Sequence, residues 1–323
     1  MSGPKTIGLD LGGTKLLVGV VGDGPAVLYR DLAASQGRTQ DELLELLERV
    51  LGEAIAAYPE TAAIGLGVPC TIDRARGLCI DAVHLPLAGV PLRDLVAERL
   101  GLPTSLDNDA NLAALAEHRF GAARGATNVV MLTIGTGIGG GLIIDGRPYS
   151  GSSGAGGEMG HIVIDQDGPP CNGNCPNRGC VEALASGTAL AREGRAAAER
   201  EPDSVLGRAR AEGREIGGPE IVAAARAGDR ASVEVLALVG RRLGVALAGL
   251  ANTFDPDVIV LGGGVMDAGD LLLDPARAEL QRRALSPQNE VPVRAAALGP
   301  EAGMIGAAML ARDEIQRGAG VSH

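Results

Sequence analysis

Apolar and polar residues along the first part of the chain alternate in the way that short strands require. Residues 6–11, 16–21 and 26–32 are three apolar segments separated by glycine-containing turns, which is typical of a hairpin meander. Residues 39–57 then place Leu, Val, Ile and Ala at helical spacing, and Thr39 with Glu42 fits a capping box. The pattern therefore predicts three strands followed by an amphipathic helix.

Strands and helices continue to alternate after this helix. The expected elements are a buried strand at 63–68, a helix at 91–100 that begins at Pro91, a short strand at 104–106, and a helix from about 107 to 120. Such alternation is typical of an α/β protein.

The pattern of strand, glycine turn and strand occurs a second time near residue 135. Residues 128–134 predict a strand, 135–141 a glycine turn and 142–145 the returning strand, which ends in the hairpin signal Asp145-Gly146. The two occurrences predict a structural repeat. The remaining expected elements are a mobile glycine-rich loop at 150–157, helices at about 183–199, 219–227, 229–253 and 301–317, and strands at 258–261 and 291–298.

Composition narrows the class of protein. The chain has 323 residues, of which 46% are hydrophobic, so it can bury the core of one large or two ordinary domains. No run approaches the roughly 18 apolar residues of a membrane span, and nothing at the start is typical of a signal peptide, so we expect a cytoplasmic protein without membrane contact. A net charge of −11 and only five Tyr and Phe residues argue against a nucleic-acid surface. Sugars are also often bound by stacking on aromatic side chains, so a sugar site in this chain would have to rely on hydrogen bonds.

Three of the five cysteines lie close together, at Cys171, Cys175 and Cys180, and His161 precedes them. One His and three Cys can supply a closed tetrahedral zinc site, and clustered cytosolic cysteines favour a metal over a disulfide. The alternative is a loop with incidental thiols. Cys70 and Cys79 lie apart and are interpreted as ordinary thiols. His84, His118 and His323 are interpreted as surface or packing residues.

The two glycine turns can hold phosphate, because glycines let backbone N–H groups approach an anion and Thr14 and Thr136 add hydroxyls. The alternative is that both are plain hairpin turns. Gly135 to Gly140 also matches the dinucleotide fingerprint G-x-G-x-x-G, but that motif requires a following helix. Since the pattern here continues as a strand, a dehydrogenase is disfavoured.

Asp109 is the candidate general base, and its alternative role is to cap the helix that begins there. A carboxylate near a helix N-terminus stays ionised at neutral pH, as a proton acceptor must. Asn108 beside it could hold an adjacent hydroxyl of a polyol. Gly262, Gly263 and Gly264 follow a predicted strand and could receive the adenosine of a nucleotide, or could simply turn into a helix.

Six short motifs follow one another along nearly the whole chain. They are Asp10-Leu-Gly-Gly-Thr14-Lys15, Leu106-Asp-Asn-Asp109, Gly135-Thr-Gly-Ile-Gly-Gly-Gly141, Glu158-Met-Gly-His161, Gly179-Cys-Val-Glu182 and Leu261-Gly-Gly-Gly264. In this combination and order they resemble the ROK family, which contains repressors and sugar kinases, and the similarity is greatest to its bacterial glucokinases.

The resemblance implies an actin-like, ribonuclease H-like duplicated two-domain fold with an interdomain cleft that closes on sugar. The domains would be residues 1–112, joined by the C-terminal helix at about 305–323, and residues 113–304 with a zinc-binding loop at 161–180. It implies ATP, Mg²⁺ and a structural Zn²⁺ as cofactors, a hexose such as glucose as substrate, and a homodimer or homotetramer.

The resemblance also implies roles for individual residues. Asp109 would remove the proton of the sugar 6-hydroxyl. The other sugar ligands would be Asn108, Glu158, His161, Glu182 and backbone near Gly67. The phosphates and metal would be surrounded by Asp10, Gly12, Gly13, Thr14, Lys15, Thr136 and Gly137.

Two positions depart from the family pattern. The family's C-x-C reads Cys171-Asn-Gly-Asn-Cys175, and its G-V-P-G reads Gly67-Val-Pro-Cys70, which places a side chain near the presumed sugar loop. Kinases of N-acetylhexosamine or fructose, and polyphosphate as a second phosphoryl donor, remain open. A sugar-sensing regulator is disfavoured, because only nine residues precede Asp10 and the chain is acidic.

Overall fold

The computed structural model describes residues 3–82 and 85–320, so His84 and His323 lie outside the described residues. Two compact units divide the chain: Met1–Gly125 with Gly141–Gly157 and Ala297–His323, and Ala126–Gly140 with Glu158–Ala296. The domain boundaries expected from the sequence stay a prediction, because a compact unit need not be a unit that folds or moves independently.

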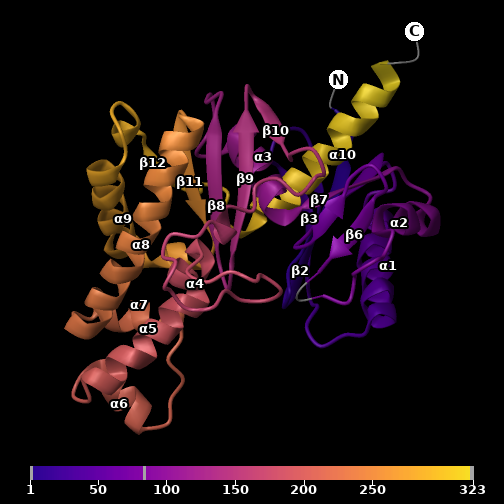
Figure 1. Cartoon of the computed structure of the whole chain (residues 1–323). Coiled ribbons are helices and arrows are strands. Elements are labelled where there is room, and N and C mark those ends of the chain that lie inside the picture. Colours follow the sequence, from indigo (N-terminus) through magenta and orange to yellow (C-terminus); the bar gives the residue numbers. More distant parts are fainter. Residues whose placement is uncertain (1–2, 83–84, 321–323) are drawn as a thin grey trace. The chain divides into compact units, whose positions relative to one another are not determined.

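The first unit is built on a five-stranded sheet of order β3-β2-β1-β4-β7 (Figure 1). Its strands are β1 Thr6–Leu11, β2 Lys15–Val21, β3 Val27–Ala34, β4 Ala63–Val68 and β7 Thr104–Asn108. The meander β1-β2-β3 is antiparallel, whereas β4 and β7 continue the sheet in parallel with β1. Because β1, β4 and β7 are parallel, their carboxyl ends meet at one edge of the sheet, where α/β proteins commonly bind ligands.

Helices cover the faces of this sheet. They are α1 Gln40–Ala57, α2 Leu92–Leu100, α3 Asp109–Phe120 and α10 Ala302–Gly320. Thr39 and Glu42 form the capping box of α1 that the sequence predicts. Helix α10 lies directly on the strands, since a Cβ placed at Gly8 or Gly65 would come within 1.9 Å of a carbonyl oxygen of that helix. Glycines in β1 and β4 therefore create the room for α10.

A short hairpin of β5 Thr71–Asp73 and β6 Leu78–Asp81 follows β4 and was not expected from the sequence. Its strands of three and four residues are too short for an alternating pattern to stand out.

The second five-stranded sheet has the order β10-β9-β8-β11-β12. Its strands are β8 Val129–Ile134, β9 Ile138–Ile144, β10 Arg147–Tyr149, β11 Val258–Gly262 and β12 Val293–Ala295. Strands β9 and β10 pair antiparallel, and β8, β11 and β12 pair in parallel. The order matches that of the first sheet strand for strand, so the predicted structural repeat is confirmed.

Several predicted boundaries in this part were wrong. Strand β9 begins at Ile138, so the glycine turn spans only Gly135 to Gly137. The helix expected at 183–199 is two helices, α4 Val181–Ala185 and α5 Gly187–Arg200, because Ser186 between them caps α5. Strand β12 has three residues where eight were expected.

The remaining helices of the second unit are α6 Val205–Ala211, α7 Gly218–Arg226, α8 Arg230–Phe254 and α9 Asp270–Arg283. Helices α8 and α9 lie side by side in Figure 1, and a Cβ at Gly240 or Gly244 of α8 would come within 2.5 Å of a backbone carbonyl of α9. Helix α9 was not expected from the sequence, because Pro275 lies inside it and proline normally breaks a helical pattern.

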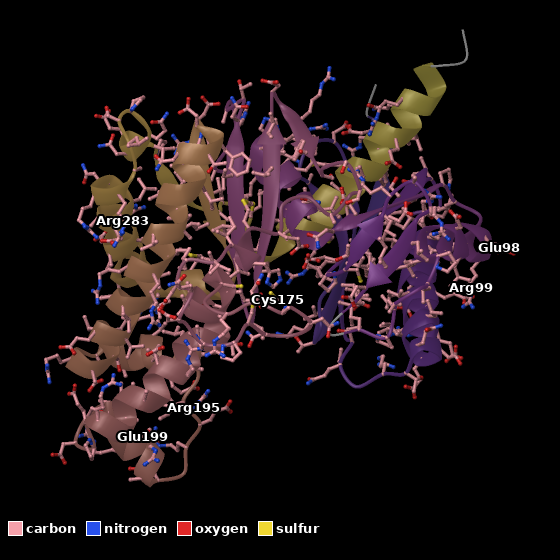
Figure 2. All side chains as sticks on the ribbon, in the orientation of Figure 1. Glu98, Arg99, Cys175, Arg195, Glu199 and Arg283 are labelled. Carbon is pink, nitrogen blue, oxygen red and sulfur yellow. The ribbon has the colours of Figure 1, made fainter. Side chains whose placement is uncertain are left out.

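Charged side chains lie on the outer faces of the helices. Figure 2 shows Glu98 and Arg99 on α2 and Arg195 and Glu199 on α5 extending away from the ribbon, and all four are exposed. Among the described helices, none is both long and apolar enough to cross a membrane.

Candidate functional site

Predicted site residues of the first unit gather at the carboxyl ends of β1, β4 and β7. In the sheet register Asp10 lies opposite Gly67, and Val68 lies opposite Asn108. A Cβ at Gly67 would come within 2.9 Å of Leu112 Cδ1 and 3.3 Å of the Leu9 carbonyl oxygen, so only glycine fits this strand position without displacing neighbours. The register therefore brings together residues that are about 100 positions apart in the chain.

Asn108 is the N-cap of α3, and Asp109 is the first residue of the helix. The Asn108 side-chain oxygen accepts hydrogen bonds from the backbone N–H groups of Ala110 at 2.9 Å and Asn111 at 3.4 Å. Its amide nitrogen donates to the carbonyl oxygen of Cys70 at 3.4 Å. Asp109 Oδ1 also accepts from the N–H of Ala110, at 2.9 Å, so both side chains contribute to capping, and Asn108 has a second amide N–H that can serve a ligand.

Asp10 and Asp109 lie near enough to influence each other's charge. Burial and, to a smaller extent, the negative charge of Asp109 raise the pKa of Asp10 to about 7. The Asp10 carboxylate also packs against Gly303 at the start of α10, where a Cβ would lie 2.4 Å from Asp10 Oδ2. No motif in the sequence marks Gly303, yet its lack of a side chain makes room for this carboxylate.

The first glycine turn is a tight β-hairpin turn. The N–H of Gly12 donates to the carbonyl oxygen of Lys15 at 2.8 Å, and the Ser35 hydroxyl donates to the Gly12 carbonyl oxygen at 2.8 Å. Thr14 and Lys15 are exposed, whereas Gly12 and Gly13 are half-buried. The hydroxyl and ammonium groups of this turn are thus accessible to a ligand.

The second glycine turn, in the second unit, is braced from two directions. The Thr188 hydroxyl donates to the carbonyl oxygen of Thr136 at 2.8 Å. Glu182 Oε2 accepts a hydrogen bond from the N–H of Ile138 at 2.8 Å, and a Cβ at Gly137 would lie 2.3 Å from this same oxygen. The Thr136 side chain is exposed. The strand β9 that follows confirms that G-x-G-x-x-G here is not the dinucleotide motif.

Glu182 therefore has a contact that the sequence did not reveal. While Oε2 holds the backbone after the glycine turn, Oε1 lies 4.0 Å from the Cys171 sulfur. The carboxylate thus lies between the Thr136 turn and the cysteine cluster within the second unit. Its short helix α4 begins directly after Cys180, which explains why Glu182 is so close to the thiols.

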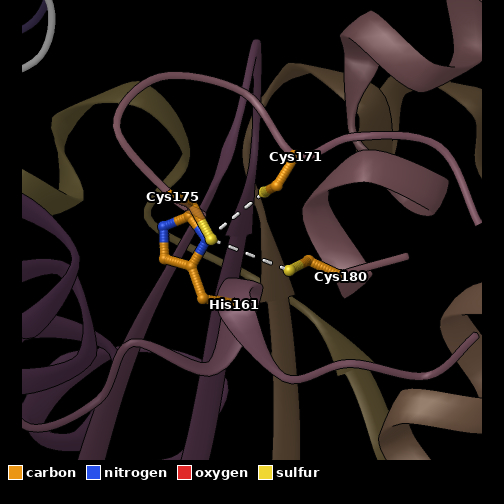
Figure 3. Close-up of side chains that lie close together, drawn as sticks. All are labelled: His161, Cys171, Cys175 and Cys180. Atoms are coloured by element: carbon orange, nitrogen blue, oxygen red, sulfur yellow. Dashed lines mark hydrogen bonds between the residues drawn. The ribbon is translucent and has the colours of Figure 1, made fainter. Parts of the chain in front are cut away.

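His161 and the three cysteines point toward one another (Figure 3). The four ligand atoms all lie within 4.8 Å of one another. Cys171 Sγ is 3.5 Å from His161 Nδ1, and Cys175 Sγ is 3.9 Å from Cys180 Sγ. A tetrahedral zinc site with Zn–S bonds of about 2.3 Å has edges of about 3.8 Å, so these separations fit a Cys₃His zinc site. Despite its unusual spacing, Cys171 joins the cluster.

The protonation of the cysteine thiols also supports a metal site at this cluster. Burial and the neighbouring thiols of Cys180 and Cys175 raise the pKa of Cys171 to about 12 when no cation is present. Three thiolates would therefore be unfavourable so close together without a metal, whose binding supplies the compensating charge. The other ring nitrogen of His161, Nε2, lies 3.9 Å from Glu158 Oε2 and faces away from the thiols.

The third glycine cluster follows β11. Gly263 has φ = 90° and caps the short 3₁₀ helix Gly264–Ala268, and a Cβ there would lie 2.4 Å from the Ile134 carbonyl oxygen. Gly263 is thus required for the close approach of two chain segments. Gly263 and Gly264 are exposed, whereas Gly262 is the buried last residue of the strand.

A hollow of about 670 Å³ lies within the first unit, between the β5–β6 hairpin, strand β10 and the loop that follows it. Arg74, Tyr149 and Ser150 are among its lining residues, but Asn108 and Asp109 are not. The hollow is therefore distinct from the sheet edge that carries the predicted base.

The two sheets of equal strand order belong to the actin-like two-domain sugar kinase fold, which the chain shares with solved ROK sugar kinases. The ROK family model matches residues 6–314, and the chain belongs to the ROK family. It is 35% identical to a glucokinase of Thermotoga maritima, over 96% of this chain and 98% of that protein, and 37% identical to a glucokinase of Streptomyces coelicolor, over 95% and 98%. The crystal structure of a ROK family glucokinase from Streptomyces griseus in complex with glucose and AMPPNP superposes with a TM-score of 0.86, at 37% identity, over 96% of this chain and 99% of that one.

Proposed function

We propose that this protein is an ATP-dependent glucokinase that phosphorylates the 6-hydroxyl of glucose. The observation that carries the proposal is the placement of Asp109 at the first turn of α3, next to Asp10, at the carboxyl edge of the first sheet. The relatives named glucokinase and the Streptomyces griseus complex with glucose and AMPPNP support the same substrates.

In this mechanism Asp109 accepts the proton of the sugar hydroxyl as that oxygen attacks the γ-phosphorus of ATP, while the bond from the γ-phosphorus to the β,γ-bridging oxygen breaks and ADP leaves. A positioned base typically contributes about 10²- to 10⁴-fold, and most of the remaining rate enhancement comes from positioning and charge neutralisation. Asn108 donates to an adjacent hydroxyl with its second amide N–H. The other proposed sugar ligands are the backbone near Gly67 and the side chains of Glu158, His161 and Glu182.

The glycine turns and the residues beside them bind the nucleotide. The proposed ligands of its phosphates and metal are Asp10, Gly12, Gly13, Thr14, Lys15, Thr136 and Gly137, and those of its adenosine are Gly262, Gly263 and Gly264. Asp10 offers the hard carboxylate oxygen that Mg²⁺ prefers. Burial and the charge of Asp109 raise its pKa, and a bound cation would compensate the negative charge of its carboxylate. When bound with ATP, Mg²⁺ neutralises charge on the transferring phosphoryl group.

Zinc has a structural role in this proposal. His161, Cys171, Cys175 and Cys180 provide four ligands and thus close a tetrahedral site. His161 would hold the metal through Nδ1, which lies beside the Cys171 sulfur, and its Nε2 would then carry the proton and could donate to a sugar hydroxyl. A cytoplasmic location and a homodimeric or homotetrameric assembly also belong to the proposal.

A coupled assay of the purified protein tests the function directly. We expect ADP release with ATP, Mg²⁺ and glucose, and a lower kcat/KM with N-acetylglucosamine, N-acetylmannosamine and fructose. Replacing ATP with polyphosphate in the same panel determines the donor. A protein that transfers phosphate to none of these sugars would refute the proposal. Preference for an N-acetylhexosamine or fructose would identify a different sugar kinase of the same family.

A further inference from the structure

Arg74 lies in the turn of the β5–β6 hairpin and joins two segments that are distant in sequence. Its Nη2 forms an ion pair with Asp107 Oδ2 at 3.0 Å, and its Nη1 donates to the Ser150 hydroxyl at 2.9 Å. We call these two contacts the Arg74 bridge. The backbone of the turn is held as well, since Arg93 of α2 donates to the Arg74 carbonyl oxygen at 3.1 Å. The guanidinium is therefore held from both sides.

One end of the Arg74 bridge supports the start of α3. Asp107 is 3% exposed, and its Oδ1 accepts from the N–H of Asn108 at 2.8 Å and from the Asn111 amide at 3.2 Å. Asp107 thus orients the residues on either side of Asp109. A buried carboxylate needs a charged or hydrogen-bonding partner, and Arg74 is the cation of this ion pair.

The other end of the Arg74 bridge holds the glycine-rich loop 150–157, which the sequence analysis expected to be mobile. The N–H of Gly156 donates to the Ser150 carbonyl oxygen at 2.8 Å and closes the loop on itself. Gly154 lies so close to the hairpin that a Cβ would be 2.6 Å from the Ile72 carbonyl oxygen. Along the chain this loop leads directly into Glu158, a proposed sugar ligand.

We propose that Arg74 is a positioning residue for phosphoryl transfer: its two terminal nitrogens hold Asp107 and Ser150, and so fix the start of α3 and the loop 150–157 in one arrangement. This inference rests on the proposed function, because it assigns to Arg74 the alignment of Asp109 and of the loop that precedes Glu158. A planar guanidinium is suited to the task, since it presents two donors in a fixed geometry, which a lysine cannot do.

Steady-state kinetics of Arg74→Ala test the proposal. We expect kcat/KM for glucose to fall roughly 10- to 100-fold, because small displacements of catalytic groups have effects of this size. The KM for ATP should stay within about twofold, which a general loss of structure would not allow. Arg76→Ala is the matched control, since Arg76 is an exposed arginine of the same hairpin turn. Arg74→Lys should be intermediate, because one ammonium cannot replace both donors.

Two further variants separate the ends of the bridge. Ser150→Ala removes only the loop contact, so it should raise the KM for glucose and leave kcat nearly unchanged. Asp107→Asn in the Arg74→Ala background removes the uncompensated buried charge and should recover part of the lost kcat/KM.

The pH profile gives an independent signature. Burial raises the pKa of Asp107, Arg74 lowers it, and the negative charge of Glu314 on α10 adds a smaller upward effect. Loss of Arg74 raises this pKa further, so Asp107 takes up a proton at a higher pH. The acid limb of the kcat/KM profile should therefore move to higher pH in Arg74→Ala and return in the Asp107→Asn double variant.

Hydrogen exchange supplies a measurement that does not depend on activity. We expect faster exchange of the Gly156 amide in Arg74→Ala and Ser150→Ala than in the wild type or Arg76→Ala. Wild-type kinetics together with wild-type exchange in Arg74→Ala would overturn the inference and leave the glucokinase proposal intact. If the wild type phosphorylates no sugar, the proposed function fails, and unchanged exchange in Arg74→Ala would then overturn the bridge as well. If Arg74→Ala does not fold, Ser150→Ala and Arg74→Lys decide by the same criteria.

Discussion

Two regions that carry predicted sugar ligands are stabilised in different ways. Asn108 and Asp109 lie where a buried parallel strand meets a helix of twelve residues, and hydrogen bonds of the cap and of Asp107 orient them. His161, by contrast, ends a 3₁₀ helix of three residues, and the segment up to Cys180 contains only isolated β-bridges. Regular secondary structure positions Asn108 and Asp109, whereas the segment from His161 to Cys180 is organised around the four potential metal ligands.

The strand end should therefore be ordered without any ion, whereas the order of the Cys₃His segment should depend on zinc. The strand end is part of a sheet with a large apolar core, so its backbone should keep its arrangement without any metal ion. The Cys₃His segment exposes Ile162 and Val163 and has little apolar core of its own, so its order should depend on zinc. We therefore expect substitutions at the strand end to change mainly kcat, and substitutions in the cysteine cluster to change mainly the affinity for glucose.

The largest expected effect is on turnover at the strand end. Asp109→Asn keeps the shape of the side chain and removes the base, so kcat should fall by about 10²- to 10⁴-fold while glucose affinity is largely kept. Steady-state kinetics and calorimetric titration with glucose measure the two quantities. Near-native turnover in this variant would exclude Asp109 as the base.

The next largest effect concerns sugar affinity at the cysteine cluster. Cys175→Ser removes one zinc ligand, so the metal content should drop from about one zinc per chain, as four-ligand sites hold one ion. The KM for glucose should rise strongly and the KM for ATP little, because the loop loses order and the sheets do not. Elemental analysis, kinetics and circular dichroism measure these changes.

Cys79→Ala is the control for this experiment, since Cys79 is a buried thiol outside the cluster. It should retain its zinc and its glucose KM. A native protein that is fully active without zinc would show that the cluster has no role in sugar binding.

A smaller effect is expected at the second glycine turn. Thr136→Val removes an exposed hydroxyl without changing the backbone hydrogen bonds of the turn, so the KM for ATP should rise about tenfold, the value of one lost hydrogen bond to a charged group. Glucose binding without nucleotide should be unchanged. Thr188→Val removes the bond to the Thr136 carbonyl and tests whether turn geometry matters separately. Equal losses for both ligands would indicate a purely structural turn.

The smallest effect is a difference in thiol reactivity with no expected change in activity. A hydrogen bond with Cys79 and burial both raise the pKa of Cys70, so this thiol stays protonated at pH 8 and should resist iodoacetamide in the native protein. After zinc removal the segment that carries Cys171, Cys175 and Cys180 should lose order, so these thiols separate, become exposed and react, and all five cysteines should react in denaturant. Mass spectrometry counts the labels, and modification of Cys70 before unfolding would contradict the assignment.

Local patterns in the sequence predicted much of the fold. The strand, glycine turn and strand of each sheet, the capping box of α1 and the buried strand β4 follow from alternation, spacing and turn residues, which act over a few neighbouring positions. Strands β5 and β6 are too short to show an alternating pattern, and Pro275 inside α9 opposes a helical interpretation, so these three elements could not be predicted from the sequence. Contacts beyond the element itself decide these cases.

Residue types and their order in the chain also identified the candidate ligands, since a histidine and three nearby cysteines limit the chemistry to few choices. Sequence could not show that Asp107 is bridged by Arg74 to Ser150, that Glu182 holds the N–H of Ile138, or that Gly303 makes room for Asp10. Each of these contacts joins residues more than 30 positions apart. Most of the longer elements, the repeat and the ligand types follow from the sequence, because they depend on local propensity and residue identity. Which distant side chains meet is a property of the tertiary structure, because burial and hydrogen bonding select among many possible pairings.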